Sequence, residues 1–321
     1  MSTISAATIN VLVDRVCDVA AGIRSFDLVR GDGGQLPPYT AGAHIELALP
    51  GGLARSFSLI GPLDDFRRYR IAVGLDANSR GGSRYLHESV AAGAALHISP
   101  PRNLFPLVED APSTVLIAGG IGITPLWCMA QRLAVLEAPW ELHYACRTRA
   151  AAAFVPEIQR ACGRTGQLHL WCDDQHEGRP LDIAAIVEGA SAQAHLYCCG
   201  PVPMLDAYRA ATGGLDQDRV HLEYFRAPEP VNPAGGFTVE LARTGTSVEV
   251  PKGCSILDAL MMNGIDAPYS CYEGLCGTCE TQVLEGEPDH RDHILTEKAR
   301  QEGRIIICCS GSRSRKLVLD L

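Results

Sequence analysis

The cysteines carry the most specific chemical signal in the sequence. Cys271, Cys276 and Cys279 follow a C-x4-C-x2-C spacing, and Cys308 and Cys309 form a pair further along the chain. Three thiols on one loop followed by a distant fourth are the plant-type ligand pattern of a 2Fe–2S cluster. A structural zinc site is the alternative, but its ligands usually come as two close C-x2–4-C pairs. The spacing therefore favours an iron–sulfur cluster.

Two features of this region bear on how a cluster would be held. Gly274 and Gly277 lie between the first three cysteines, where the lack of a side chain lets the loop wrap closely and aim backbone N–H groups at the cluster sulfurs. Successive residues of a strand point to opposite faces, so only one of Cys308 and Cys309 could face the cluster. Spacing alone leaves the choice between them open.

A second set of chemically suggestive residues lies near the N-terminus. The run Arg55-Ser56-Phe57-Ser58 resembles the R-x-Y/F-S/T flavin motif of ferredoxin-reductase-like barrels. An arginine suits a phosphate, an aromatic side chain packs on a ring system, and the Ser58 hydroxyl could hydrogen-bond near the flavin N5. A surface arginine beside a hairpin is the alternative interpretation of Arg55.

A glycine-rich segment adds to this flavin signal. Arg80-Gly81-Gly82-Ser83 precedes the only helix expected in the first part of the chain, at 85–90. Free N–H groups at a helix N-terminus bind anions, and glycines permit close approach. Together with Arg55, this segment fits one terminal phosphate better than a dinucleotide, although an ordinary capped turn is the alternative.

A third set of residues indicates a nucleotide site. Gly119, Gly120, Gly122 and Thr124 lie where a predicted strand meets a predicted helix, and glycines there allow a tight turn and close approach to a pyrophosphate. The run Cys199-Gly200-Pro201 ends a later strand. In ferredoxin-reductase-like proteins, the cysteine of such a C-G-P sequence lies beside the nicotinamide, which implies that role for Cys199; a buried small residue is the alternative. Arg147 could bind ribose or phosphate.

Periodicity indicates the elements that position these residues. Short alternating runs in residues 1–107 predict a small antiparallel β-barrel, with strands at 9–16, 23–29, 44–49, 54–60, 68–75 and 96–99. Residues 112–226 alternate strands with helices, which indicates a parallel sheet with ligands outside the carboxyl ends of its strands. The expected strands are 114–118, 141–145, 168–172, 195–199 and 220–224, and the expected helices lie near 125–137, 154–162, 181–188 and 203–212.

A change in composition marks a third part of the chain. Residues 227–236 carry three prolines and two glycines, which predicts a semi-rigid linker. After it, a hairpin of strands 237–241 and 247–250 and a short helix at 255–262 precede the cysteine loop. We therefore expect three domains, at 1–107, 112–226 and 237–321.

Composition and charge exclude several classes of protein. The chain has 321 residues with 46% apolar residues, which is typical of a globular protein of two or three domains. A net charge of −9 argues against nucleic-acid binding. Glycines and a proline interrupt the most apolar stretch, Leu116 to Ala130, so we expect no membrane span. The N-terminus shows no secretory signal, so we expect a cytoplasmic protein whose thiols serve metal or redox chemistry rather than disulfides.

The chain resembles the phthalate dioxygenase reductase family, which includes vanillate O-demethylase reductases. The resemblance is carried mainly by the last fifty or so residues, through the C-x4-C-G-T-C loop, Asp289–Asp292, Cys308–Ser310 and the terminal Leu317–Leu321. The earlier segments Ile71–Val73, Ser79–Ser83 and Pro101–Pro106 also match. In that family the last cluster ligand stands directly before a residue-Ser pair, which implies that Cys308 is the fourth ligand.

The family resemblance implies a fold, cofactors and site residues. It implies an antiparallel β-barrel that binds FMN, an α/β parallel-sheet domain that binds NADH, and an α+β β-grasp ferredoxin domain of the plant type. Ala72 and Val73 would border the flavin ring, and Phe225 would cover it until the nicotinamide displaces it; plain core packing is the alternative for Phe225. Ser58, Cys199 and Phe225 would therefore lie next to the reacting atoms.

The resemblance also implies a partner. The chain has no C-x-H with C-x2-H spacing of the Rieske type, so a terminal oxygenase would be a separate chain, and we expect the reductase to be a monomer. The alternatives are a reductase for a cytochrome P450 or a carnitine-type oxygenase, or a ferredoxin-like redox sensor without enzymatic activity.

Overall fold

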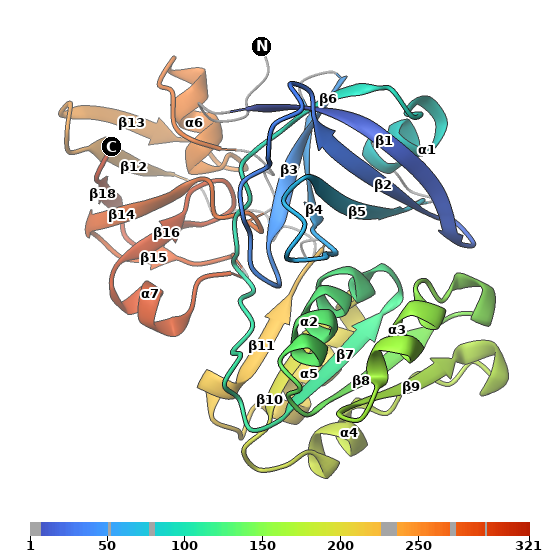
Figure 1. Cartoon of the computed structure of the whole chain (residues 1–321). Helices are drawn as coiled ribbons and strands as arrows, with labels where there is room; N and C mark the ends of the chain where they lie inside the picture. The colour runs from blue at the N-terminus through green and yellow to red at the C-terminus, as the bar shows by residue number, and fades with distance from the viewer. Residues whose placement is uncertain (1–7, 51–52, 77–80, 226–235, 270–273, 293) are drawn as a thin grey trace. The chain divides into compact units, whose positions relative to one another are not determined.

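The computed structural model describes residues 8–50, 53–76, 81–225, 236–269, 274–292 and 294–321 (Figure 1). The chain divides after Phe225 into two compact units, which are treated separately below. Arg80, Cys271 and nearly all of the expected linker 227–236 lie outside the described residues.

The first six strands form the expected antiparallel barrel. They are β1 (Ile9–Ala20), β2 (Ile23–Arg30), β3 (His44–Leu49), β4 (Leu53–Ser58), β5 (Arg68–Gly74) and β6 (Ala95–Ile98). Their order is β4-β3-β6-β1-β2-β5. The backbone N–H of Ile60, just after β4, donates to the carbonyl of Arg70 on β5 at 2.9 Å. The two ends of the sheet therefore meet, which brings the flavin motif on β4 beside the segment 71–73 on β5.

A parallel sheet follows the barrel. Its strands are β7 (Thr114–Gly119), β8 (Trp140–Cys146), β9 (Gly166–Cys172), β10 (His195–Cys199) and β11 (Val220–Glu223), in the order β11-β10-β7-β8-β9. Every neighbouring pair is parallel. The helices are α2 (Ile123–Val135), α3 (Val155–Cys162), α4 (Ile183–Gly189) and α5 (Val202–Thr212). The carboxyl ends of all five strands therefore lie at one edge, where the sequence predicts the nucleotide.

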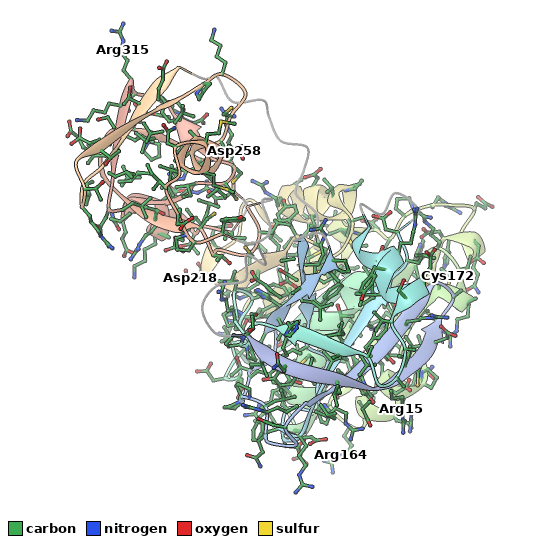
Figure 2. The ribbon with its side chains drawn as sticks, turned by 90° about the horizontal axis from the view of Figure 1, so that it is seen from above. Arg15, Arg164, Cys172, Asp218, Asp258 and Arg315 are labelled. Carbon is green, nitrogen blue, oxygen red and sulfur yellow. The ribbon has the colours of Figure 1, made fainter. Side chains whose placement is uncertain are left out.

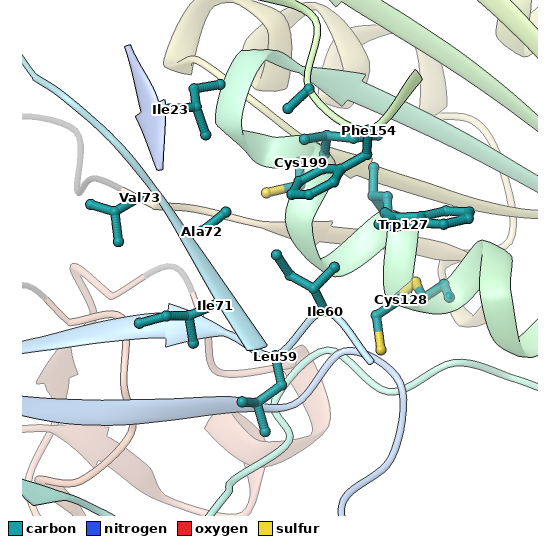
Figure 3. Packing of buried hydrophobic residues seen from close by; sticks show 14 of the residues in the cluster. Ile23, Leu59, Ile60, Ile71, Ala72, Val73, Trp127, Cys128, Phe154 and Cys199 are labelled. Carbon is teal, nitrogen blue, oxygen red and sulfur yellow. The ribbon is translucent and has the colours of Figure 1, made fainter. Parts of the chain in front are cut away.

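The barrel and the parallel sheet share one hydrophobic core. Figure 3 shows Ile60, Ile71 and Ala72 of the barrel among the same buried residues as Trp127 and Phe154 of the α/β part. The side-chain amide of Gln131 on α2 donates to the Ile60 carbonyl at 2.8 Å. This continuous packing fixes the β4–β5 region relative to the carboxyl edge of the sheet.

The second compact unit has its own sheet and core. Its five main strands are β12 (Phe237–Leu241), β13 (Thr246–Val250), β14 (Glu280–Glu285), β16 (Arg304–Ile306) and β18 (Lys316–Leu319), in the order β13-β12-β18-β14-β16. Two short strands, β15 (Pro288–Asp289) and β17 (Gly311–Ser312), form a second small sheet. The helix α7 (Glu297–Gln301) lies between them along the chain. Helix α6 (Ile256–Met262) begins at a reciprocal capping box between Ser255 and Asp258. Figure 2 labels Asp258. This is the mixed sheet and helix of a β-grasp ferredoxin domain.

Charged side chains lie on the surface of the described part of the chain. Arg15, Arg164 and Arg315 point outward (Figure 2) and are exposed. No helix in this part of the chain is long and apolar enough to cross a membrane.

Candidate functional site

Arg55 lies against the N-terminus of the barrel's only described helix. Helix α1 covers Gly82–Ser89 and so starts three residues before the expected Tyr85, because Gly81 takes a φ of +106° at its N-cap. A Cβ on Gly82 would lie 3.1 Å from the Arg55 Cγ. The glycine thus leaves room for the arginine stem across the helix end. The guanidinium and the N-terminus of α1 together suit a phosphate.

Two contacts hold α1 against β5. The imidazole Nε2 of His87 lies 2.8 Å from the carbonyl of Val73, and the N–H of Asp76 donates to the Ser83 hydroxyl at 3.3 Å. His87 was not among the residues predicted for this site, because a lone histidine on a short helix carries no sequence signal. These contacts place the anion-binding end of α1 beside the strand that is expected to border the ring.

The remaining flavin candidates lie on the two closing strands. On β4, Ser56 is exposed, Phe57 is half-buried and Ser58 is 6% exposed at the strand end. On β5, Ala72 and Val73 are buried. The structure therefore brings all the described candidates together around the β4–β5 junction, with Arg55 and the N-terminus of α1 on one side.

Gly119 and Gly122 lie where two turns pack closely. A Cβ on Gly122 would lie 2.2 Å from the Cys199 carbonyl oxygen, and one on Gly119 would lie 2.6 Å from the ring of Pro201. The two glycines therefore let the turn after β7 pack directly against the turn after β10, and their contact with a pyrophosphate stays a prediction. Gly200 is equally close, because its Cβ would lie 2.6 Å from the Met204 sulfur.

Three other predicted nucleotide residues lie at the same edge in distinct settings. Gly120 has a φ of +54° and no atom within 4 Å of its Cβ position, so it is the glycine that leaves open space. Thr124 is 2% exposed and its hydroxyl donates to the Ile121 carbonyl at 3.0 Å, which stabilises the turn. Arg147 is exposed after β8, where its carbonyl accepts from the N–H of Asp174 at 3.1 Å.

Cys199 faces a carboxyl group that the sequence reasoning missed. Its Sγ lies 4.0 Å from an Oε of Glu223, the residue paired with it on β11. Burial raises the pKa of the Cys199 thiol well above its usual value, and raises the pKa of Glu223 to about 8. A glutamate at the end of a parallel strand was the available signal. Phe225, two residues later, is 39% exposed.

The raised pKa of Glu223 predicts a pH-dependent stability. The folded state holds a proton that the unfolded chain releases near pH 4.3, so this contribution is complete below that pH and is lost as the pH rises through about 8. As the pH rises from about 4.3 to about 8, the wild-type melting temperature should fall relative to that of Glu223→Gln.

A matched variant controls this measurement. Glu88 is exposed on α1, so Glu88→Gln should follow the wild-type curve of melting temperature against pH. If Glu223→Gln also ran parallel to the wild type, Glu223 would be ionised in the folded state and would have no raised pKa.

The described cysteines that are predicted as cluster ligands are buried. Cys276 and Cys279 are each 3% exposed and Cys308 is 7% exposed. Cys279 and Cys308 belong to the core of the second unit, and the N–H of Ile307 donates to the Cys279 carbonyl at 3.4 Å. These buried thiols fit a cluster held close to the protein. The loop fits it too, because a side chain in place of Gly274 would have no room.

Cys308 and Cys309 are not strand residues, which corrects the argument from alternation. Strand β16 ends at Ile306, and the N–H groups of Cys309 and Ser310 both turn back to the Ile306 carbonyl. In a turn, neighbouring side chains need not point to opposite faces. A Cβ on Gly274, whose φ is +70°, would lie 2.6 Å from the Cys309 sulfur, so both thiols lie near the loop and the assignment of Cys308 stays a prediction.

Comparisons with family models match two parts of the chain. The family model for the oxidoreductase NAD-binding domain matches residues 116–210. The model for the 2Fe-2S iron-sulfur cluster binding domain matches residues 239–311. These two matches cover the parallel sheet and the unit that holds the cysteine loop.

Whole-chain relatives are also found. Tetrachlorobenzoquinone reductase of Sphingobium chlorophenolicum is 50% identical, with 98% of each chain covered. Vanillate O-demethylase oxidoreductase of Pseudomonas sp. (strain HR199 / DSM 7063) is 42% identical, covering 98% of this chain and 100% of that protein. The solved structure of phthalate dioxygenase reductase is 36% identical, with 98% of each chain covered and a TM-score of 0.71.

Proposed function

Because the chain belongs to the phthalate dioxygenase reductase family, we propose that it passes electrons from NADH through FMN and a 2Fe–2S cluster to a separate terminal oxygenase. The observation that carries the proposal is the presence of a barrel, an NAD-binding domain and a 2Fe–2S domain in one chain that matches such a reductase along 98% of its length. The acceptor class that we propose is the Rieske oxygenase of an aromatic dioxygenase or O-demethylase system.

The flavin would supply the conversion of a two-electron hydride donor into single-electron transfer. Arg55 and the N-terminus of α1 would bind its phosphate, while Ala72 and Val73 would border its ring. Ser58 would donate a hydrogen bond near the ring, and Phe225 would exclude water from its open face. The barrel and the α/β sheet share one core, which supports this arrangement because it fixes the position of the flavin residues relative to Cys199.

The dinucleotide and the iron–sulfur cluster would be bound by residues already described. Gly120, Arg147 and the Cys199–Pro201 turn would orient the dinucleotide at the carboxyl edge of the sheet. Cys271, Cys276, Cys279 and Cys308 would hold the cluster. We propose the domain limits 1–107, 112–226 and 237–321, with 227–236 as the linker, and a monomer in the cytoplasm that binds neither nucleic acid nor membrane.

The proposal is tested with the purified holoprotein. Its visible spectrum should show both flavin and 2Fe–2S absorbance, and NADH should drive reduction of cytochrome c. Addition of a matching oxygenase with its aromatic substrate should couple NADH oxidation to product formation. A colourless protein with one zinc ion per chain would overturn the proposal.

A quinone reductase is a second candidate function. The relative at 50% identity is named tetrachlorobenzoquinone reductase, so a halogenated benzoquinone is a candidate acceptor for this chain too. Direct NADH-dependent reduction of such a quinone, at a rate that candidate oxygenases do not approach, would favour this function over the oxygenase partner.

Arg55→Ala should lose FMN more readily than the wild type. The variant removes the guanidinium that lies beside the N-terminus of α1, and a charge-assisted hydrogen bond to a phosphate contributes roughly 1.5–3 kcal/mol. Flavin content after extended dialysis, measured by absorbance, should therefore fall about tenfold or more. Arg67→Ala, at an exposed position of the same barrel, should keep its flavin; equal retention in both variants would remove Arg55 from the site.

A further inference from the structure

Two histidines and a glutamate converge on one face of the parallel sheet. Glu141 and His143 lie two residues apart on β8, so their side chains share a face. His169 on the edge strand β9 is the direct register partner of His143. One carboxylate oxygen and one ring nitrogen from each histidine all lie within 4.8 Å of one another.

The distances are close to those of a metal site. The Glu141 Oε2 lies 3.5 Å from the His143 Nε2 and 3.8 Å from the His169 Nε2. Ligands bound at about 2.0–2.2 Å to a tetrahedral ion are separated by roughly 3.3 Å. The two rings are stacked, with centroids 4.6 Å apart and planes 14° apart, so binding one ion requires a ring to rotate until its nitrogen faces that ion.

Two further properties favour a cation here. Among the described residues, the His143 Nε2 is a buried atom without a hydrogen-bond partner, and a buried polar atom without a partner is costly unless a ligand satisfies it. The side chain of His169 is 48% exposed, so an ion could enter from solvent.

We propose that Glu141, His143 and His169 form a binding site for a divalent first-row transition cation of the zinc type. Two imidazoles and one carboxylate are a ligand set that such ions accept, with water completing the shell. The histidines lie three residues before the ends of β8 and β9, or about 10 Å from the nucleotide edge. The site is therefore separate from the proposed electron path, and the bound ion would fasten the edge strand β9 to β8.

Zinc binding to the chelator-treated holoprotein tests the proposal. Calorimetric titration with ZnCl2 should show one site per chain that is absent from His143→Ala and His169→Ala. Glu141→Gln should bind zinc about tenfold more weakly or worse, since loss of one of three ligands costs at least as much as loss of an outer-shell partner. Saturating zinc should also raise the melting temperature of the wild type but not of His169→Ala.

The controls separate this site from other ligands. His97→Ala removes an exposed histidine of the barrel and should bind zinc like the wild type. Flavin and cluster absorbance report that each variant is folded, whatever its zinc affinity. The proposal is overturned if the wild type binds no zinc, or if His143→Ala and His169→Ala bind it as tightly as the wild type, in which case a surface thiol is the ligand.

Discussion

Cys276→Ser is expected to abolish NADH-dependent reduction of cytochrome c while leaving reduction of ferricyanide close to the wild-type rate. Cys276 is 3% exposed on the cysteine loop of the second compact unit, and serine replaces a thiolate that would bind iron. The flavin and nucleotide residues belong to the other unit, which has its own core. Separate assays with cytochrome c and ferricyanide measure the two activities, and visible absorbance measures the cluster content.

Cys309→Ser is the matched control, since this thiol lies near the same loop but is not an assigned ligand. It should keep the cluster absorbance that Cys308→Ser loses. The reverse result would transfer the fourth ligand to Cys309. If Cys276→Ser lost ferricyanide reduction as well, the two units would not be functionally separable.

Gly122→Ala is expected to impair both nicotinamide binding and stability. Its φ of −61° would suit alanine, but the added methyl group would lie 2.2 Å from the Cys199 carbonyl oxygen and 2.5 Å from the carbonyl carbon. Backbone must therefore move, at a cost of about 1–3 kcal/mol or more for overpacking. We expect a lower melting temperature and a KM for NADH raised about tenfold, because the Cys199–Pro201 turn would be displaced.

Gly189→Ala provides the comparison, since nothing lies within 4 Å of its Cβ position at the end of α4. This variant should match the wild type in both measurements. A Gly122→Ala protein that also matched it would show that the two turns are not packed as closely as described. Should Gly122→Ala fail to fold, the loss of soluble protein against a normal Gly189→Ala yield gives the same result.

The order and type of the elements could be predicted from the sequence because each pattern was local. The alternation in 68–73 predicted β5, and the short helix expected at 255–262 is α6. The start of α1 was misplaced because the left-handed conformation of Gly81, rather than hydrophobic periodicity, determines it.

The parts of the site that depend on tertiary contacts could not be predicted. The close packing at Gly122 is one such part, since the sequence does not reveal that the carbonyl of Cys199 on β10 lies beside it. Glu223 ends a predicted strand, but its significance depends on the register that places it opposite Cys199. The argument from alternation at Cys308 and Cys309 failed because strand β16 ends at Ile306, two residues before Cys308.

The burial of most other cysteines bears on how the cofactor is assembled in the cell. Burial raises the pKa of Cys128 and Cys146 to about 12 and that of Cys198 above its usual value. These thiols stay protonated and covered once the first unit has folded, so they cannot capture incoming iron or sulfide. Among the described cysteines outside the proposed ligand set, the half-buried ones are left as the thiols that would compete for incoming iron, and these are Cys17, Cys162, Cys254 and Cys309.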